Sequence, residues 1–210
     1  MQLAVIGATG GTGLQVVEQA LERGHFVTAF VRDPTKLKLK HINLTVLTGN
    51  VLEPHTLLPA VRRQDAVICA LGSRPGKTDH AVSEGTKNLI AAMHETGVRR
   101  LLLVSSLGVG ESFADASLSS KLFIKTVLSG PIAEKEMQEE AVRNSGLDWL
   151  IVRPTRLNND SPRGSYKVGE HLKFSLFAMP QISRADVAAF LLDQLDSNHY
   201  VGQALTITDK

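Results

Sequence analysis

The first thirteen residues read Met1-Gln-Leu-Ala-Val-Ile-Gly7-Ala-Thr-Gly10-Gly-Thr-Gly13, an apolar run followed directly by a glycine-rich turn. A helical pattern begins at Leu14. Gly7 permits a tight turn after a strand, Gly10 lets the backbone approach a pyrophosphate, and Gly13 lets the helix pack against the sheet. The first N–H groups of that helix, with the positive end of its dipole, then face the phosphates. The stretch therefore predicts a dinucleotide site.

Outward from this turn, apolar runs alternate with helical patterns along most of the chain. We expect strands at residues 3–6, 26–31, 44–47, 66–70, 100–104 and 149–152, and helices at 12–23, 54–62, 80–96 and 133–144. The strands lack polar alternation, as in a parallel sheet covered on both faces. Gly24, Gly97 and Gly146 stand where left-handed helix C-caps are expected. Repeated strand–helix units predict a doubly wound α/β sheet of the Rossmann type.

After Pro154 the pattern is less regular. Residues 157–169 are rich in Asn, Ser, Pro and Gly and are expected to form a long loop. A helix is expected over 183–195, opened by Ser183 with Asp186 as an approximate capping box, and a closing strand over 205–208. We expect one NAD(P)-binding domain over 1–210, with residues 154–210 contributing a small substrate-side lobe.

Composition narrows the class of protein. The 210 residues include 43% hydrophobic and 21% charged residues, which is ordinary for a globular domain, and the net charge of +2 is too small to indicate nucleic acid or an anionic membrane as a partner. No apolar run reaches the roughly 18 residues of a membrane span, and because the first strand begins almost at residue 1 we expect no signal peptide. The single cysteine, Cys69, excludes an intramolecular disulfide. A cytoplasmic location is expected.

The turn and the end of the second strand predict the coenzyme. Backbone N–H groups and hydroxyls for a pyrophosphate are expected from Gly7, Thr9, Gly10, Gly11, Thr12 and Gly13. NAD sites usually place an acidic residue at the end of the second strand, but here Arg32 stands there, and its guanidinium can pair with a 2′-phosphate. Asp33 is expected to cap the turn at Pro34. NADP is therefore expected rather than NAD; the alternative is a solvated Arg32–Asp33 pair.

Three later strand ends supply further candidates. After the third strand, Asn50 and Val51 are placed to contact adenine, and Ala70, Leu71 and Gly72 end the fourth strand beside the coenzyme ribose. Both groups are equally well explained as turn residues. Ser105 and Ser106 end the fifth strand, beside the expected nicotinamide and substrate, or else cap the turn there.

Several segments together resemble a known family. They are Gly7–Gly13, Arg32-Asp33-Pro34, Ser105-Ser106-Leu107-Gly108, the run 145–154 with Val152-Arg-Pro154, and Ser183-Arg-Ala-Asp186-Val. They are similar to the atypical short-chain dehydrogenase/reductases, in particular the NmrA-like proteins and the flavin reductase/biliverdin-IXβ reductases, which residues 71–93 also resemble. The resemblance covers nearly the whole chain and implies a Rossmann fold and an NAD(P) coenzyme, but does not identify the substrate.

One departure from that family bears on the chemistry. Typical members use a Tyr-x-x-x-Lys pair, in which the tyrosine exchanges the substrate proton. Four residues before Lys135 stands Pro131, and the only tyrosines are Tyr166 and Tyr200. For Lys135 two interpretations are open: it contacts the coenzyme ribose, or it is a solvated lysine on the surface of the helix. Alcohol–ketone chemistry with a tyrosine acid is therefore disfavoured.

The remaining expectation is NADPH-dependent hydride transfer to a flat conjugated acceptor (a flavin, quinone or bilin), where the protein mainly orients the reactants and excludes water. Ser106 and the backbone at Pro154 would position the ring, and Thr155 and Arg156 would line the acceptor side. Arg74 would anchor an acidic group, or is a free surface residue. The alternatives are a non-catalytic NADP(H)-binding regulator of the NmrA-like type and, less favoured, a nucleotide-sugar epimerase or dehydratase.

An apolar segment at residues 118–128, with two lysines, has a helical period. Three interpretations are open for this segment. It could form a lid over an aromatic acceptor or a weak contact with a membrane surface, or it could be a helix packed on its own domain or at a dimer contact. The seven histidines show no metal-ligand spacing.

Overall fold

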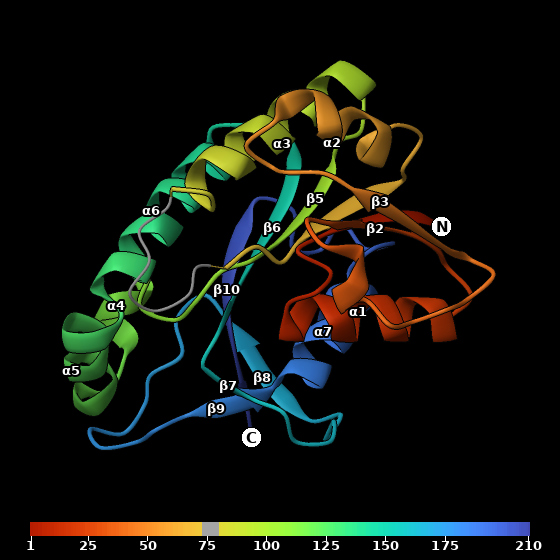
Figure 1. The fold of residues 1–210 in the computed structure, drawn as a ribbon. Coiled ribbons are helices and arrows are strands. Elements are labelled where there is room, and N and C mark those ends of the chain that lie inside the picture. The colour runs from red at the N-terminus through yellow and green to blue at the C-terminus, as the bar shows by residue number, and fades with distance from the viewer. Residues whose placement is uncertain (73–79) are drawn as a thin grey trace.

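The structure, a computed structural model, describes residues 1–72 and 80–210, and its centre is a sheet of mostly parallel strands (Figure 1). The strand order is β3-β2-β1-β4-β5-β6-β10-β8, and all neighbours are parallel except β10 and β8. The strands are β1 (Gln2–Ile6), β2 (Phe26–Val31), β3 (Leu44–Thr48), β4 (Ala66–Cys69), β5 (Arg100–Val104), β6 (Asp148–Pro154), β8 (Tyr166–Gly169) and β10 (Gln203–Asp209). A separate two-stranded sheet pairs β7 (Arg156–Asn158) with β9 (Gln181–Ser183).

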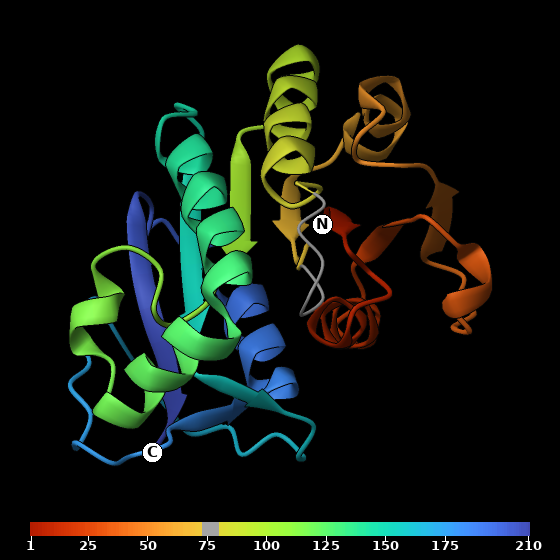
Figure 2. The ribbon, with the colours of Figure 1, turned by 60° about the vertical axis from the view of Figure 1, so that its left-hand side comes forward.

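Helices cover both faces of the large sheet, as the turned view in Figure 2 shows. They are α1 (Gly11–Glu22), α2 (Pro54–Val61), α3 (Ser83–Thr96), α4 (Ser112–Asp115), α5 (Leu118–Val127), α6 (Ser129–Arg143) and α7 (Arg184–Asp193), with a 3-10 turn η1 (Pro34–Lys36). Along β1, Leu3 and Val5 pack in the core with α1 and α7, whereas Ala4 and Ile6 pack with α2, α3 and α6. The doubly wound α/β prediction is confirmed.

The glycines expected at helix ends are also confirmed. Gly24, Gly97 and Gly146 all have positive φ, between 66° and 78°, in the left-handed region that glycine adopts without strain. Each follows a helix, and the chain then turns back toward the next strand. None of the described helices is long and apolar enough to cross a bilayer.

Three expectations about elements need correction. The strand expected at 44–47 is present, but none of the five residues of β3 is buried and three are exposed, because β3 lies at the edge of the sheet. The long loop expected over 157–169 instead contains part of β7 and all of β8. Both pair with segments far along the chain, β8 with residues 206–209, and such pairing overrides local preference. Helix α6 begins at Ser129 rather than residue 133, because Pro131 is tolerated in a first turn, whose N–H groups need no helical partner.

Candidate functional site

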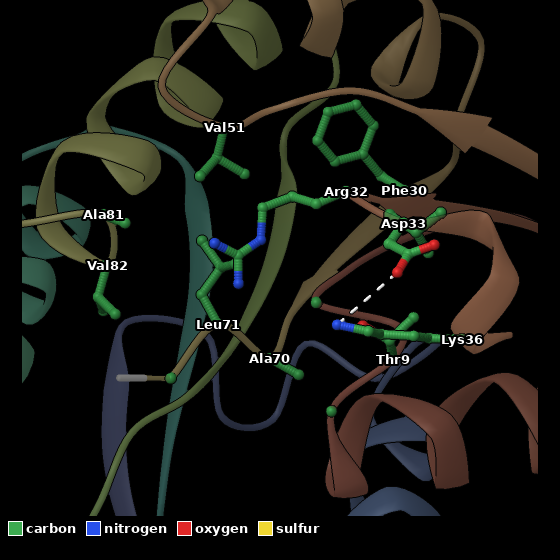
Figure 3. A pocket seen from close by; sticks show the side chains of 14 residues that line it. Thr9, Phe30, Arg32, Asp33, Lys36, Val51, Ala70, Leu71, Ala81 and Val82 are labelled. Atoms are coloured by element: carbon green, nitrogen blue, oxygen red, sulfur yellow. Dashed lines mark ion pairs between the residues drawn. The ribbon is translucent and has the colours of Figure 1, made fainter. Parts of the chain in front are cut away.

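A first cavity of about 620 Å³ lies at the carboxyl ends of β1, β2 and β4 (Figure 3). Its walls come from the β1–α1 turn, the end of β2, and the segments that follow β3 and β4. The lining residues are Gly7, Thr9, Gly10, Phe30, Val31, Arg32, Asp33, Lys36, Val51, Ala70, Leu71, Gly72, Ala81 and Val82. The structure thus brings together most of the residues that the sequence predicts to hold the coenzyme.

The glycine turn is tightly packed. Gly7 has a φ of +85°, and a Cβ there would lie 2.7 Å from the carbonyl oxygen of Ala70. A Cβ on Gly13 would lie 2.2 Å from the carbonyl oxygen of Gly7. Gly10 is the N-cap of α1 and provides no side-chain hydrogen bond to it, so no cap side chain would compete with an anion for the first N–H groups of the helix. Gly11, Thr12 and Gly13 form the first turn of α1 behind this cap.

Arg32 extends from the end of β2, and Figure 3 shows its guanidinium between Val51 and Leu71, inside the first cavity. Asp33 is turned to its own loop, where its carboxylate accepts hydrogen bonds from the backbone N–H (3.0 Å) and hydroxyl (2.6 Å) of Thr35. The prediction that Asp33 caps the turn at Pro34 is confirmed. The Asp33 carboxylate pairs at 3.8 Å with Lys36, so it does not occupy the Arg32 guanidinium.

Asn50 and Val51, which follow β3 and Gly49, differ in position. Asn50 accepts a hydrogen bond from the backbone N–H of Leu52 at 3.2 Å and so closes a local turn. Val51 lines the first cavity and packs on Gly85, where a Cβ would lie 2.5 Å from its side chain. A role of Asn50 in contacting adenine remains a prediction.

A second cavity of about 450 Å³ lies at the ends of β5 and β6. Most of its lining is apolar, and one wall is α5, which contributes Ser120, Phe123 and Ile124. The other lining residues are Ser105, Ser106, Leu107, Leu128, Pro154, Thr155, Arg156, Leu157, Met179, Pro180 and Arg184. The segment 118–128 therefore packs on its own domain as a wall of this cavity.

The candidate hydroxyls of the second cavity have different partners. Ser105 is buried and donates to the carboxylate of Glu139 at 2.5 Å. Ser106 donates to the carbonyl of its neighbour Leu107 at 3.1 Å and is half-buried. Thr155 is buried and donates to the hydroxyl of Thr208 at 3.2 Å. Ser106 thus has the most accessible of these three hydroxyls.

Lys135 is buried between the two cavities and is not the solvated lysine of the alternative interpretation. Its ammonium donates to the carbonyls of Leu71 (2.6 Å) and Val104 (2.7 Å) and to the Gln138 side chain (2.7 Å). These bonds join the ends of β4 and β5. Burial lowers the pKa of the Lys135 amine from 10.5 to about 8. The nearby Cys69 is fully buried, and burial raises the pKa of its thiol, which keeps it protonated.

A buried ion pair is linked to the second cavity through Ser105, one of its lining residues, and no sequence signal predicted it. The Arg153 guanidinium, 1% exposed, holds both carboxylate oxygens of Glu139, through Nε at 2.9 Å and Nη2 at 2.6 Å. The same guanidinium reaches the partly exposed Glu111 at 3.0 Å. Because Glu139 also accepts from Ser105, the pair ties the end of β5 to α6 and β6.

The hydrogen bond from Arg153 lowers the pKa of Glu111 from 4.5 to about 2, which predicts a pH-dependent contribution to stability. A depressed carboxyl pKa stabilises the folded state above about pH 4.5, and this contribution is lost as the pH falls toward 2. We therefore expect Glu111→Gln to destabilise the protein at pH 7, and the difference from the wild type to shrink in acid. Urea unfolding at several pH values measures it, with Glu136→Gln, an exposed α6 residue, as control. A difference independent of pH would contradict this expectation.

Sequence reasoning missed Arg184 as a site residue. It is the first residue of α7 and lines the second cavity, yet its side chain also lies over the glycine turn: a Cβ on Gly11 would lie 2.7 Å from its Cδ. Its guanidinium donates to the side chain of Asn159 at 2.7 Å. The run Ser183-Arg-Ala-Asp186-Val carried the family resemblance but gave Arg184 no role, because only the packing of α7 on α1 brings these groups together. Arg74, predicted to anchor an acidic group, lies outside the described residues.

Comparison with protein families gives one match over nearly the whole chain: residues 7–198 match the model described as NAD(P)H-binding. An uncharacterised chloroplast protein of Arabidopsis thaliana is 36% identical over 173 residues, covering 77% of this chain and 61% of that protein. The uncharacterised protein YwnB of Bacillus subtilis is 27% identical, covering 100% of this chain and 99% of its own length. The photosystem II assembly factor Ycf39 of Guillardia theta is 35% identical, covering 99% of this chain and 64% of that protein.

Solved structures share the fold. ChuY, an anaerobillin reductase from Escherichia coli, superimposes with a TM-score of 0.84 at 23% identity, covering 100% of this chain and 97% of that one. A short-chain dehydrogenase/reductase from Veillonella parvula in complex with NADP superimposes with a TM-score of 0.81 at 19% identity, covering 98% of this chain and 93% of that one. The chain spans less than two thirds of the Arabidopsis and Guillardia relatives.

Proposed function

The chain belongs to the NAD(P)H-binding family, and from this premise we propose that it is an NADPH-dependent reductase that transfers hydride to a flat conjugated acceptor such as a flavin, a quinone or a bilin. The observation that carries the proposal is the pair of adjoining cavities. The first holds a guanidinium and a glycine turn, and the second is mainly apolar. A cytoplasmic location remains a prediction, since one relative is named as chloroplastic.

The first cavity fits the coenzyme because its donors match a dinucleotide. The glycine turn and the uncapped start of α1 offer N–H groups to a pyrophosphate, and a Cβ on Gly13 would close the approach. Val51, Ala70, Leu71 and Gly72 would border the adenosine and ribose. When bound, the reduced coenzyme supplies the hydride, and Pro154 with the serines after β5 would lie beside its reactive end.

Arg32 is expected to select the phosphorylated coenzyme. In Arg32→Ala we expect the affinity for NADPH to fall by about 10- to 100-fold, because charge-assisted hydrogen bonds of about 1.5–3 kcal/mol are lost, while NADH binding changes little. Titration calorimetry with both coenzymes measures the change, and Arg62→Ala, an exposed arginine outside the cavity, is the control. Equal losses for NADPH and NADH would show that Arg32 does not read the 2′-phosphate.

The second cavity fits a flat acceptor with an acidic substituent. Its apolar side chains would exclude water and hold a ring, and Ser106 would orient the ring edge. Arg156 and Arg184 would face an anionic group. Lys135 and Ser105 would act as positioning residues, because their hydrogen bonds run to strand ends and to Glu139. The hydride acceptor delocalises its charge, so no protein acid is required.

Turnover tests this proposal. Purified protein with NADPH and FMN, riboflavin or menadione should consume NADPH, followed at the nicotinamide absorbance band, with FMN favoured over the uncharged riboflavin. Ser106→Ala should lower kcat by less than the roughly 10²–10⁴-fold that marks loss of a general acid. No NADPH oxidation above background with any acceptor in the panel would refute the reductase.

A second candidate is a non-catalytic NADP(H)-binding regulator, favoured by the similarity to a photosystem II assembly factor and by the missing tyrosine. In that case coenzyme occupancy would alter a protein interface. Tight NADPH binding without turnover, and a partner retained in only one redox state of the coenzyme, would support it. Rapid NADPH oxidation would count against it.

A further inference from the structure

Exposed apolar side chains gather at one end of the molecule. Among the described residues, twelve large apolar side chains are exposed, and seven of them lie in α5 or in the loop that precedes β9. We define the α5 surface by six of these residues: Leu118, Leu122, Phe123, Leu176, Phe177 and Met179. Phe177 is 77% and Leu122 65% exposed, although chains of this size normally scatter such residues.

The two segments form one continuous surface. The backbone N–H of Leu118 donates to the carbonyl of Leu176 at 3.0 Å, and the hydroxyls of Ser117 and Ser119 both donate to the carbonyl of Ala178, at 2.7 and 3.0 Å. Both views show the loop running alongside α5 (Figures 1 and 2). Because the loop is tied to the helix by these bonds, the exposed side chains are held in place rather than left without support.

The two segments that form this surface carry basic and no acidic side chains, and Asp115, next to them in the chain, is already paired with His171 at 2.9 Å. Neither residues 116–133 nor residues 171–185 contain an acidic residue, although the chain has 21. The same stretches carry Lys121, Lys125 and Lys173. Lys121 and Lys125 lie within 6 Å of the Phe113 ring centroid, at 5.9 and 5.7 Å, beside the apolar side chains. The net charge of +2 hides this separation, because acidic residues elsewhere offset it.

The charge discriminates between two occupants. In a symmetric dimer the same surface meets itself, so segments that carry lysines and no acidic residue would meet an equal positive charge without a carboxylate to pair with it. A bilayer with anionic headgroups offers the opposite charge, and its acyl region accepts leucine and phenylalanine side chains. An apolar surface with adjacent lysines matches that partner.

We propose that the α5 surface binds the face of a membrane that carries anionic lipids, with Leu122 and Phe177 entering the acyl boundary and Lys121 and Lys125 at the headgroups. Phe123 and Met179 belong both to this surface and to the wall of the second cavity. The cavity wall therefore reaches the membrane-facing side of the protein. This association needs no spanning helix and does not depend on the proposed reductase activity.

Vesicle flotation tests the proposal with the full chain. We expect the protein to float with vesicles of equimolar phosphatidylcholine and phosphatidylglycerol, and not with phosphatidylcholine alone. Leu122→Ser with Phe177→Ser should weaken binding by about tenfold or more, because two apolar side chains no longer insert. Ile42→Ser is the matched control, since Ile42 is 96% exposed but lies between β2 and β3. It should bind as the wild type does.

The charge is tested separately. Lys121→Glu with Lys125→Glu should reduce flotation with the mixed vesicles, whereas Lys38→Glu with Lys40→Glu, exposed lysines after η1, should have little effect. Thermal melting confirms that each variant is folded. The proposal is overturned if the wild type does not float with anionic vesicles. It is also overturned if the apolar control and the lysine control lose as much binding as the variants of the α5 surface with which they are matched. It is also overturned if sedimentation shows a stable dimer that Leu122→Ser with Phe177→Ser dissociates.

Discussion

Gly13→Ala is expected to reduce NADPH affinity by about a hundredfold or more and to destabilise the fold. The new Cβ would lie 2.2 Å from the carbonyl oxygen of Gly7 and 2.9 Å from its carbonyl carbon. Both are backbone atoms, so the turn itself must move, and displacement of its N–H groups by about an ångström has large effects on a bound ligand. In an unobstructed helix the same replacement would stabilise the fold by up to about 1 kcal/mol, so a loss of stability in Gly13→Ala would identify the clash as its cause.

Gly10→Ala is the graded control for this prediction. A Cβ there would lie 3.3 Å from the same Gly7 oxygen, a contact that a small shift relieves, and its φ of −75° suits any residue. We expect thermal melting to find a far smaller loss of stability than in Gly13→Ala, whereas calorimetry should still find weaker NADPH binding, because a Cβ on Gly10 would stand where the backbone approaches the pyrophosphate. If both variants bind NADPH as the wild type does, the turn is not the phosphate site.

Glu139→Gln is expected to lower the free energy of unfolding by about 3 kcal/mol, the lower end of the range for breaking a buried ion pair. The Arg153 guanidinium would remain buried opposite an amide, with only the partly exposed Glu111 carboxylate left to balance its charge. Ser105 would also lose its carboxylate acceptor. Urea unfolding at pH 7 measures the change.

Glu140→Gln is the matched control for Glu139→Gln. It makes the same substitution one residue further along α6, where the side chain is exposed, and should change stability by no more than about 0.5 kcal/mol. Combining Glu139→Leu with Arg153→Met should restore much of the lost stability, because it removes both charges. Equal effects of Glu139→Gln and Glu140→Gln would contradict the assigned ion pair.

The sequence predicted those parts of the site that depend on local chemistry. Glycine spacing predicts the turn before α1, and the position of Arg32 one residue after a buried strand predicts its place in the first cavity. The Asp33 cap follows from a short polar side chain before proline. The family resemblance stated from these motifs is supported by the NAD(P)H-binding match.

The parts that the sequence did not predict depend on distant pairings. Lys135 meets the carbonyl of Leu71 across 64 positions, and no local pattern shows that three acceptors surround it. Arg184 reaches Gly11 only because α7 packs on α1. Likewise β8, a short strand in a region rich in turn residues, forms because β10 offers it an edge.

The Arg184 side chain is common to both compartments of the molecule: it rests on the glycine turn and borders the apolar chamber. A ligand in either compartment would therefore depend on the conformation of this one guanidinium. In the proposed reductase, a coenzyme on the turn would fix the position of this side chain before the second reactant enters. We therefore expect an ordered arrival, coenzyme first and acceptor second.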